Sequence, residues 1–204
     1  MTTATQPAVT RAATEDAPAL ARTLARAFAA DPVSVWFYAR EADRLARLQR
    51  GYERLFLRRI ALPRDATFTV AGHAGVAMWL PPGQAHLGAL EQLRLLPAMV
   101  AEFGRDLPRA MRRMGAMDAV HPHEPHWYLW LLGVDPQHQG EGLGSLLLAE
   151  VLDRCDRDRV PAYLQATTPR SRELYLRHGF EDSGELCMPD DGPRLWPMWR
   201  EPGA

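Results

Sequence analysis

The chain contains no lysine, and all 24 of its basic residues are arginine. This absence excludes a nucleotide-binding P-loop, whose lysine contacts the phosphates, and any chemistry that needs a lysine Schiff base. Cysteine is scarce too, with only Cys155 and Cys187. Two cysteines provide neither a disulfide framework nor a paired-cysteine metal site. Cys155 follows an apolar helical pattern, so we expect it to pack in the core.

The chain also lacks an excess of charge of one sign, because its formal net charge is −1 at pH 7. This balance provides no long-range attraction for nucleic acid or for an anionic membrane surface, so we expect neither as a partner. No apolar run is long enough for a membrane span, and the N-terminus lacks the apolar region of a secretory signal. We therefore expect a cytoplasmic protein.

The composition indicates one globular domain. The 204 residues are 47% hydrophobic and 24% charged, which is ordinary for a folded chain of this size. Residues 1–8 are small and polar and are expected to form a disordered tail, followed by a single domain over residues 9–204. Apolar periodicity predicts helices over residues 15–30, 41–62, 87–103 and 107–117, and strands over 9–12, 67–71, 75–80 and 162–166. Pro32 is expected to end the first helix.

The most informative segment is residues 134–145, which read Val-Asp-Pro-Gln-His-Gln-Gly-Glu-Gly-Leu-Gly-Ser. It lies between the apolar run 126–133 and a helical pattern over 146–154, so its glycines fall at a strand-to-helix turn. Glycine lets the backbone approach a ligand closely, and the first amides of a helix have no intrahelical partner. The segment therefore predicts a binding site for a pyrophosphate.

Three kinds of phosphate loop compete for this segment. A dinucleotide-binding loop would need its third glycine where the chain has Ser145, and an acidic residue closing the next strand. The next strand, residues 161–167, contains none. The P-loop is excluded by the missing lysine. The remaining pattern, Gln-x-x-Gly-x-Gly from Gln139 to Gly144, resembles the acyl-CoA pyrophosphate loop of the GNAT acetyltransferase superfamily.

A second motif strengthens this resemblance. Residues 162–166 form a predicted strand, followed by Pro169, Tyr175 and the pair Gly179-Phe180. The order and spacing match the strand, the tyrosine-bearing short helix and the aromatic-glycine corner of GNAT enzymes. The resemblance implies an α/β (α+β) fold, in which helices flank a mixed central sheet with a splayed acyl-CoA cleft. It also implies acetyl-CoA as the acyl donor.

A narrower resemblance extends over nearly the whole chain. Segments 11–18, 24–28, 124–125, 137–140, 175–180 and 192–200 are similar to those of actinobacterial puromycin N-acetyltransferases. This likeness implies transfer of an acetyl group to a primary amine of a small molecule, such as an aminonucleoside or another antibiotic-like amine, and a role in antibiotic resistance or biosynthesis. Two alternatives stay open: acetylation of protein or peptide amino groups, and a non-catalytic acyl-CoA-binding module.

The GNAT resemblance also assigns residues to the cofactor. It implies that the backbone of Leu132, Gly133 and Val134 contacts the pantetheine arm, with Gly133 at a β-bulge. Amides of the loop would bind the pyrophosphate, and the Ser145 hydroxyl would add a bond; the loop residues are Gln139, Gly140, Glu141, Gly142, Leu143, Gly144 and Ser145. Two positions depart from the family pattern. Glu141 stands where a basic residue is common, and Ser171, a further expected cofactor contact, stands where many relatives carry asparagine.

Catalytic roles follow from the same resemblance. Tyr175 corresponds to the tyrosine that protonates the leaving thiolate. The amine must lose a proton, and Glu124 and His126 are the candidate bases because they precede the cofactor strand. The run from His121 to His126 contains imidazoles and a carboxylate suited to zinc. However, two prolines stiffen it into an extended path that scatters the ligands, so we expect no metal.

The region 84–123 is expected to shape the acceptor site. Met99, Met111, Met114 and Met117 recur in it at helical spacing, either as core packing, which we favour, or as an adaptable pocket lining. The sequence carries no signal of oligomeric state. The apolar segment 195–199 is interpreted as a terminal strand that completes the sheet.

Overall fold

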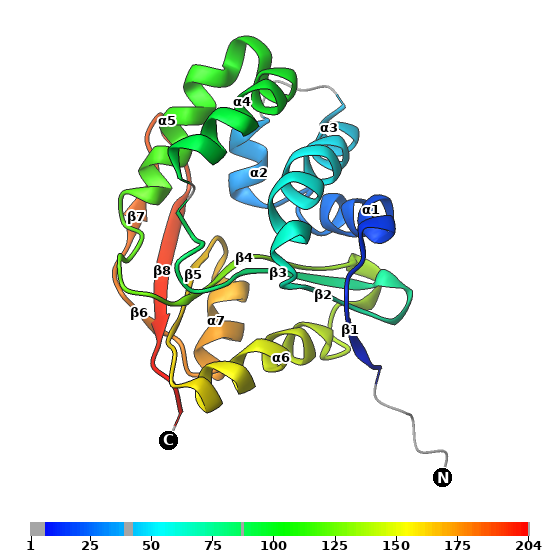
Figure 1. Ribbon diagram of the computed structural model, residues 1–204, viewed down its shortest axis with the longest axis vertical. Helices are drawn as coiled ribbons and strands as arrows, with labels where there is room; N and C mark the ends of the chain where they lie inside the picture. Colours follow the sequence, from blue (N-terminus) through cyan, green and yellow to red (C-terminus); the bar gives the residue numbers. More distant parts are fainter. Residues whose placement is uncertain (1–6, 39–42, 87, 204) are drawn as a thin grey trace.

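A central mixed β-sheet organises the molecule (Figure 1). The computed structural model describes residues 7–38, 43–86 and 88–203, so most of the expected disordered tail, residues 1–6, lies outside the described residues. The strands follow one another across the sheet in the order β1 (Val9–Arg11), β2 (Thr67–Val70), β3 (Gly75–Leu80), β4 (Trp127–Val134), β5 (Ala162–Ala166), β8 (Arg194–Arg200) and β6 (Glu181–Asp182), and β7 (Leu186–Cys187) also pairs with β8.

The parallel pair β4 and β5 separates along its length. Trp127 to Leu129 pair with Ala162 to Leu164, and the two strands diverge beyond these residues. Trp130 contributes to the divergence, because it is the extra residue of a bulge in β4: the register against β3 shifts between Met78 and Trp79. The sheet therefore opens into a cleft near its centre, as expected for the GNAT fold.

Helices cover both faces of the sheet (Figure 1). One face carries α1 (Ala17–Ala27), α2 (Pro32–Phe37), α3 (Arg44–Gly51), α4 (Ala89–Phe103) and α5 (Leu107–Asp118); the other carries α6 (Leu143–Asp158) and α7 (Pro169–Arg177). Successive side chains of β3 point to opposite faces of the sheet and so contribute to the hydrophobic core on each face. Val76 and Met78 pack under the first group of helices, and Trp79 packs under α6. The predicted mixed α/β architecture is confirmed.

The prediction that Pro32 ends the first helix was wrong. Helix α1 already ends at Ala27, and Pro32 begins α2. Asp31 caps this second helix, because its carboxylate accepts hydrogen bonds from the amides of Val33 (2.9 Å) and Ser34 (3.1 Å). Proline suits the first turn of a helix, where its missing N–H needs no partner.

The helix predicted over residues 41–62 is one continuous element with two geometries. From Asp43 onward, α3 passes directly into a π-helix, Tyr52–Ala61, while residues 41 and 42 lie outside the described residues. Toward the other end of the chain, the predicted terminal strand is present as β8, and it lies between β5 and β6. Arg200 at its end forms two hydrogen bonds with Asp156 of α6, at 2.7 and 2.9 Å.

Candidate functional site

The loop before α6 has the geometry of an anion site. Gly140 and Gly142 have φ angles of +91° and +81°, which only glycine adopts readily, and Gly142 caps the helix. The first helical hydrogen bond after this cap runs from the Leu146 amide to Gly142 O (3.1 Å), so the amides of residues 143–145 precede it. A Cβ built at either glycine meets no atom within 4 Å. The N-terminus of a 16-residue helix is thus open to a ligand.

Side chains around the loop set its charge. Gln139 donates a hydrogen bond from Nε2 to Val134 O (3.2 Å), and its Oε1 accepts one from Arg170 of α7 (3.0 Å). Glu141 is exposed and lies beside His138, with 3.3 Å between Oε2 and Nδ1. Arg170 was missed by the sequence reasoning. It brings a cation to a loop whose own sequence supplies a carboxylate.

The Ser145 hydroxyl already has a partner. Its Oγ lies 3.0 Å from Nε2 of His178, at the end of α7. Burial lowers the pKa of His178, and the neighbouring Arg177 and Arg200 add to this effect. Ser145 therefore joins the start of α6 to the end of α7.

A narrow cleft lies between β4 and β5. Its lining residues are Phe28, Leu129, Trp130, Leu131, Leu132, Leu164, Gln165, Thr167, Ser171 and Tyr175. The cleft thus brings together the strand Leu129–Leu132, the residue after β5 and two residues of α7. Three of the predicted site residues, Leu132, Ser171 and Tyr175, lie on its walls.

Tyr175 is held in a buried position in this cleft. Its side chain is 7% exposed, and its ring packs edge-on against Phe180 at 6.0 Å between centroids. Burial raises the pKa of Tyr175, and the negative charge of Asp31 raises it further. The phenol therefore stays protonated near neutral pH, which is the state needed in a proton donor.

Ser171 helps to cap the N-terminus of α7. The backbone amide of Thr168 donates to Ser171 Oγ (3.2 Å), and the backbone amide of Ser171 donates to Thr168 Oγ1 (3.1 Å), which forms a reciprocal cap at the start of α7. This cap fixes the helix that carries Tyr175.

Gly133 does not form the bulge expected for it. It pairs in regular register with Val76, and the bulge lies at Trp130. Glycine is favoured at this position because α1 packs closely on it: a Cβ at residue 133 would lie 3.1 Å from Leu24, Ala27 and Phe28. Helix α1 therefore packs directly against the backbone of β4, next to the cleft.

The structure places Glu124 and His126 away from the cleft. Glu124 is exposed, and neither residue is among those that line the cleft. His126 is 2% exposed at the start of β4; its Nδ1 lies 2.6 Å from Glu124 O, and its Nε2 lies 3.0 Å from His121 Nε2. Burial lowers the pKa of both histidines, that of His121 to about 3. In the part of the chain that the structure describes, no three His, Cys, Asp or Glu side chains are grouped to hold a metal.

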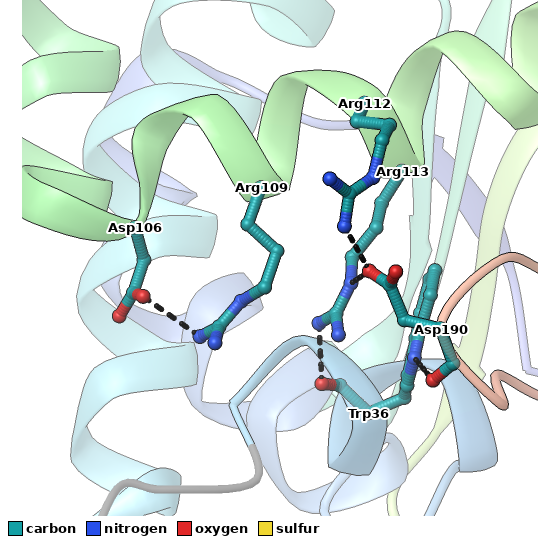
Figure 2. Close-up of polar contacts among 6 residues, drawn as sticks. All are labelled: Trp36, Asp106, Arg109, Arg112, Arg113 and Asp190. Carbon is teal, nitrogen blue, oxygen red and sulfur yellow. Dashed lines mark hydrogen bonds and ion pairs between the residues drawn. The ribbon is translucent and has the colours of Figure 1, made fainter.

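The methionine-bearing segment forms α4 and α5. Met99 and Met114 pack against the core and Met111 is half-exposed; none of them lines the cleft. Arginines of α5 instead fasten neighbouring elements (Figure 2). Arg113 lies over the ring of Trp36 (3.9 Å), donates to Trp36 O (2.7 Å) and pairs with Asp190, as Arg112 also does. Helix α5 is thereby joined to α2 and to the turn between β7 and β8.

Comparison with known proteins agrees with this geometry. Residues 109–180, which include the loop and Tyr175, match the model of the acetyltransferase (GNAT) family. The crystal structure of a Corynebacterium glutamicum protein, described as histone acetyltransferase HPA2 and related acetyltransferase, is 27% identical, has a TM-score of 0.74 and covers 98% of both chains. The chain is thus similar to GNAT-type acetyltransferases.

Two further matches extend the comparison. An uncharacterized N-acetyltransferase of Schizosaccharomyces pombe is 25% identical over 210 residues, which cover 96% of this chain and 83% of that protein. A Drosophila melanogaster polyamine N-acetyltransferase, at 15% identity with a TM-score of 0.65 over 96% of this chain and all of that one, shares the fold. The protein is an acyl-CoA-dependent N-acetyltransferase, which transfers an acyl group from an acyl-CoA to an amine. In its described residues, no helix is long and apolar enough to cross a membrane.

Proposed function

We propose that the protein transfers the acetyl group of acetyl-CoA directly to a primary amine of a small molecule, of the aminonucleoside or antibiotic-like type. The observation that carries the proposal is the cleft between β4 and β5, which the buried Tyr175 lines and whose wall residue Leu132 lies 4.0 Å from a Cβ built at Gly144, in the first turn of α6. One domain over residues 9–204, located in the cytoplasm, would perform this reaction.

The aromatic wall of the cleft supports a small acceptor. Phe28 and Trp130 line the cleft, and Tyr52 and Phe56 of the π-helix stand behind them. Ring centroids lie 6.0 Å apart for Phe28 and Tyr52, 5.8 Å for Tyr52 and Phe56, and 5.1 Å for Phe56 and Trp130. Such rings favour an acceptor whose amine is attached to an apolar or aromatic group.

Each part of the site then has a role. The pyrophosphate binds the amides of residues 139–145, and the pantetheine arm pairs with Leu132, Gly133 and Val134. The neutral amine attacks the thioester carbonyl, and Tyr175 donates its proton to the leaving thiolate sulfur. A protonated phenol, kept so by burial, suits this step.

A second candidate is acetylation of protein or peptide amino groups. The similarity to the Corynebacterium glutamicum structure, which is described as a histone acetyltransferase and related acetyltransferase, favours it. The two candidates differ in the acceptor and share the donor site.

An assay of thiol release from acetyl-CoA over a panel of amines tests the proposal. The panel includes puromycin, arylalkylamines, polyamines and short peptides with free amino groups. We expect turnover with small amines that carry an aromatic or apolar group. Turnover with peptides alone would favour the second candidate, and tight acetyl-CoA binding without turnover on any amine would indicate a non-catalytic module.

A further inference from the structure

We propose that Asp31, acting through the hydroxyl of Thr167, accepts the proton that the attacking amine loses. The inference rests on the proposed acetyl transfer and adds the base that this reaction needs. The base candidates expected from the sequence, Glu124 and His126, lie outside the cleft. Asp31 and Thr167 are 136 positions apart in the chain and meet at its edge.

Thr167 is the member of the pair that faces the acceptor. It directly follows β5, where the parallel strands have separated, and it lines the cleft together with Tyr175. Its Oγ1 donates its hydrogen to Asp31 Oδ2 at 2.5 Å. Because that hydrogen is engaged, the lone pairs of Oγ1 are left to accept an N–H of an amine bound in the cleft.

Asp31 is a buried carboxylate without a compensating cation. It is 9% exposed, and in the described part of the chain it forms no ion pair. Glu102, which is 8% exposed, provides the contrast, because it pairs with Arg47 at 3.2 Å. A buried carboxylate that lacks a cation gains more by accepting a proton than a paired one does.

The groups that face Asp31 come from several elements. Its Oδ1 accepts the amides of Val33 and Ser34 in α2, and its Oδ2 accepts Thr167 after β5. Tyr52 of the π-helix and Tyr175 of α7 lie close enough for its charge to raise the pKa of each phenol. Burial raises the pKa of Asp31 itself, against the lowering effect of its three hydrogen bonds. This direction brings a carboxyl closer to the pH at which a base works best.

The proton balance is complete within the pair and Tyr175. The bound ammonium first gives one proton to Thr167 Oγ1, and the hydroxyl hydrogen of Thr167 moves to Asp31. The neutral amine then attacks the carbonyl carbon. Tyr175 gives its proton to the sulfur as the C–S bond breaks, and its phenolate takes the second proton that the nitrogen loses. At the end, Asp31 holds one proton and Tyr175 is neutral again. Exchange with water after product release restores Asp31.

The arrangement also relates the base to the acid. While Asp31 is ionised, its charge keeps Tyr175 protonated; once Asp31 accepts the amine proton, that charge is gone. The phenol then becomes a stronger proton donor as the thiolate leaves. A single carboxylate therefore favours each proton transfer in the order in which the reaction needs it.

Asp31→Asn is the decisive variant, because asparagine caps helices well and keeps the size of the side chain but accepts no proton. With the best alkylamine of the panel at pH 7, we expect kcat to fall about 100-fold. The rate should recover as the pH rises and neutral amine accumulates. With an alkoxyamine, which is already neutral at pH 7, the loss should shrink to less than about 3-fold, since it has no ammonium proton for Asp31 to remove.

Two sets of variants complete the test. Thr167→Val should behave like Asp31→Asn, and Thr167→Ser should retain most of the wild-type rate. Asp43→Asn is the matched control, since Asp43 also caps a helix, α3, whereas it is Asp31 that accepts the hydrogen bond of Thr167. Acetyl-CoA affinity, measured by calorimetry, should stay unchanged in all four.

The possible results separate this inference from the proposed function. An equal loss with alkylamine and alkoxyamine, or no loss with either, would overturn the role of Asp31, because a purely structural cap does not distinguish amines by their pKa. If the wild-type protein acetylates no amine, the proposed function fails, and the inference fails with it.

Discussion

Arg170 donates a hydrogen bond from Nη1 to Gln139 Oε1 at 3.0 Å, which joins α7 to the loop before α6. This contact places a guanidinium beside the predicted pyrophosphate site. We expect Arg170→Gln to raise the KM for acetyl-CoA about 5-fold while kcat changes little, because an exposed cation contributes about 1 kcal/mol. Steady-state kinetics at low and high salt measure this. Arg105→Gln, between α4 and α5, is the control and should leave the KM unchanged.

Glu141 has the opposite effect on the same loop. Its exposed carboxylate adds negative charge at the proposed site of the dianionic pyrophosphate. We expect Glu141→Gln to tighten acetyl-CoA binding about 3-fold at low ionic strength, with a smaller gain in high salt. Calorimetric titration at two salt concentrations checks this. Equal affinities of variant and wild type at low salt would show that the carboxylate points away from the bound pyrophosphate.

Removal of the Tyr175 hydroxyl tests its role as the acid. Tyr175→Phe keeps the ring that packs on Phe180. We expect kcat to fall about 100-fold, with little change in acetyl-CoA affinity, because the hydroxyl acts on the leaving thiolate. The rate of thiol release and a binding titration measure the two quantities. If Tyr175→Phe kept the wild-type kcat, Tyr175 would not be the acid that protonates the thiolate.

Replacing either of two glycines by alanine is expected to change stability, in opposite directions. Gly133→Ala puts a Cβ 3.1 Å from Leu24, Ala27 and Phe28, so we expect it to lower the free energy of unfolding by about 1–3 kcal/mol. Gly115→Ala, inside α5, meets no atom within 4 Å and should raise the free energy of unfolding by about 0.5–1 kcal/mol. Urea denaturation of both variants provides the comparison. A stable Gly133→Ala protein would show that α1 moves away without cost.

Because His121 and His126 are buried, we expect the folded protein to lose stability in acid. Burial lowers the pKa of His121 from 6.5 to about 3 in the folded chain. Between these pH values the unfolded chain binds more protons, so the free energy of unfolding falls as pH drops from 6.5 toward 3, by about 1.4 kcal/mol per pH unit. Above pH 6.5 this contribution is constant.

His121→Phe tests that prediction, because it keeps a ring against Tyr128 and Tyr163. We expect a shallower loss of stability between pH 6 and pH 4 than in the wild type, measured by urea denaturation at several pH values. The exposed His138→Gln is the control. A wild-type slope in His121→Phe would assign the acid sensitivity to other groups.

Local sequence predicted the backbone around the proposed donor site well. Glycines 140, 142 and 179 lie at positive φ, where the sequence placed turns and helix ends, and Pro169 begins α7 as its position indicated. These features depend on neighbours within a few residues. For the same reason, the strand β5 and helix α7 appear where they were predicted.

Features that depend on contacts between distant parts of the chain escaped prediction. The Asp31–Thr167 bond spans 136 positions and the Arg170–Gln139 bond spans 31, and no local pattern encodes either. The bulge at Trp130 arises from a register shift against β3. The strands β6 and β7 are two residues each, too short for a periodic pattern.

The position of β8 has a consequence for folding during synthesis. One edge of β5 pairs with β4, and its other edge pairs with β8, which the ribosome makes only after α7, β6 and β7. Until β8 arrives, that second edge has free amides and carbonyls, which are prone to pair with other chains. The Arg200–Asp156 contact at the end of β8 can form only after that strand has been made. The half of the sheet that carries Thr167 and the neighbouring α7 is therefore completed late, and chaperone binding to nascent chains should persist until β8 has emerged.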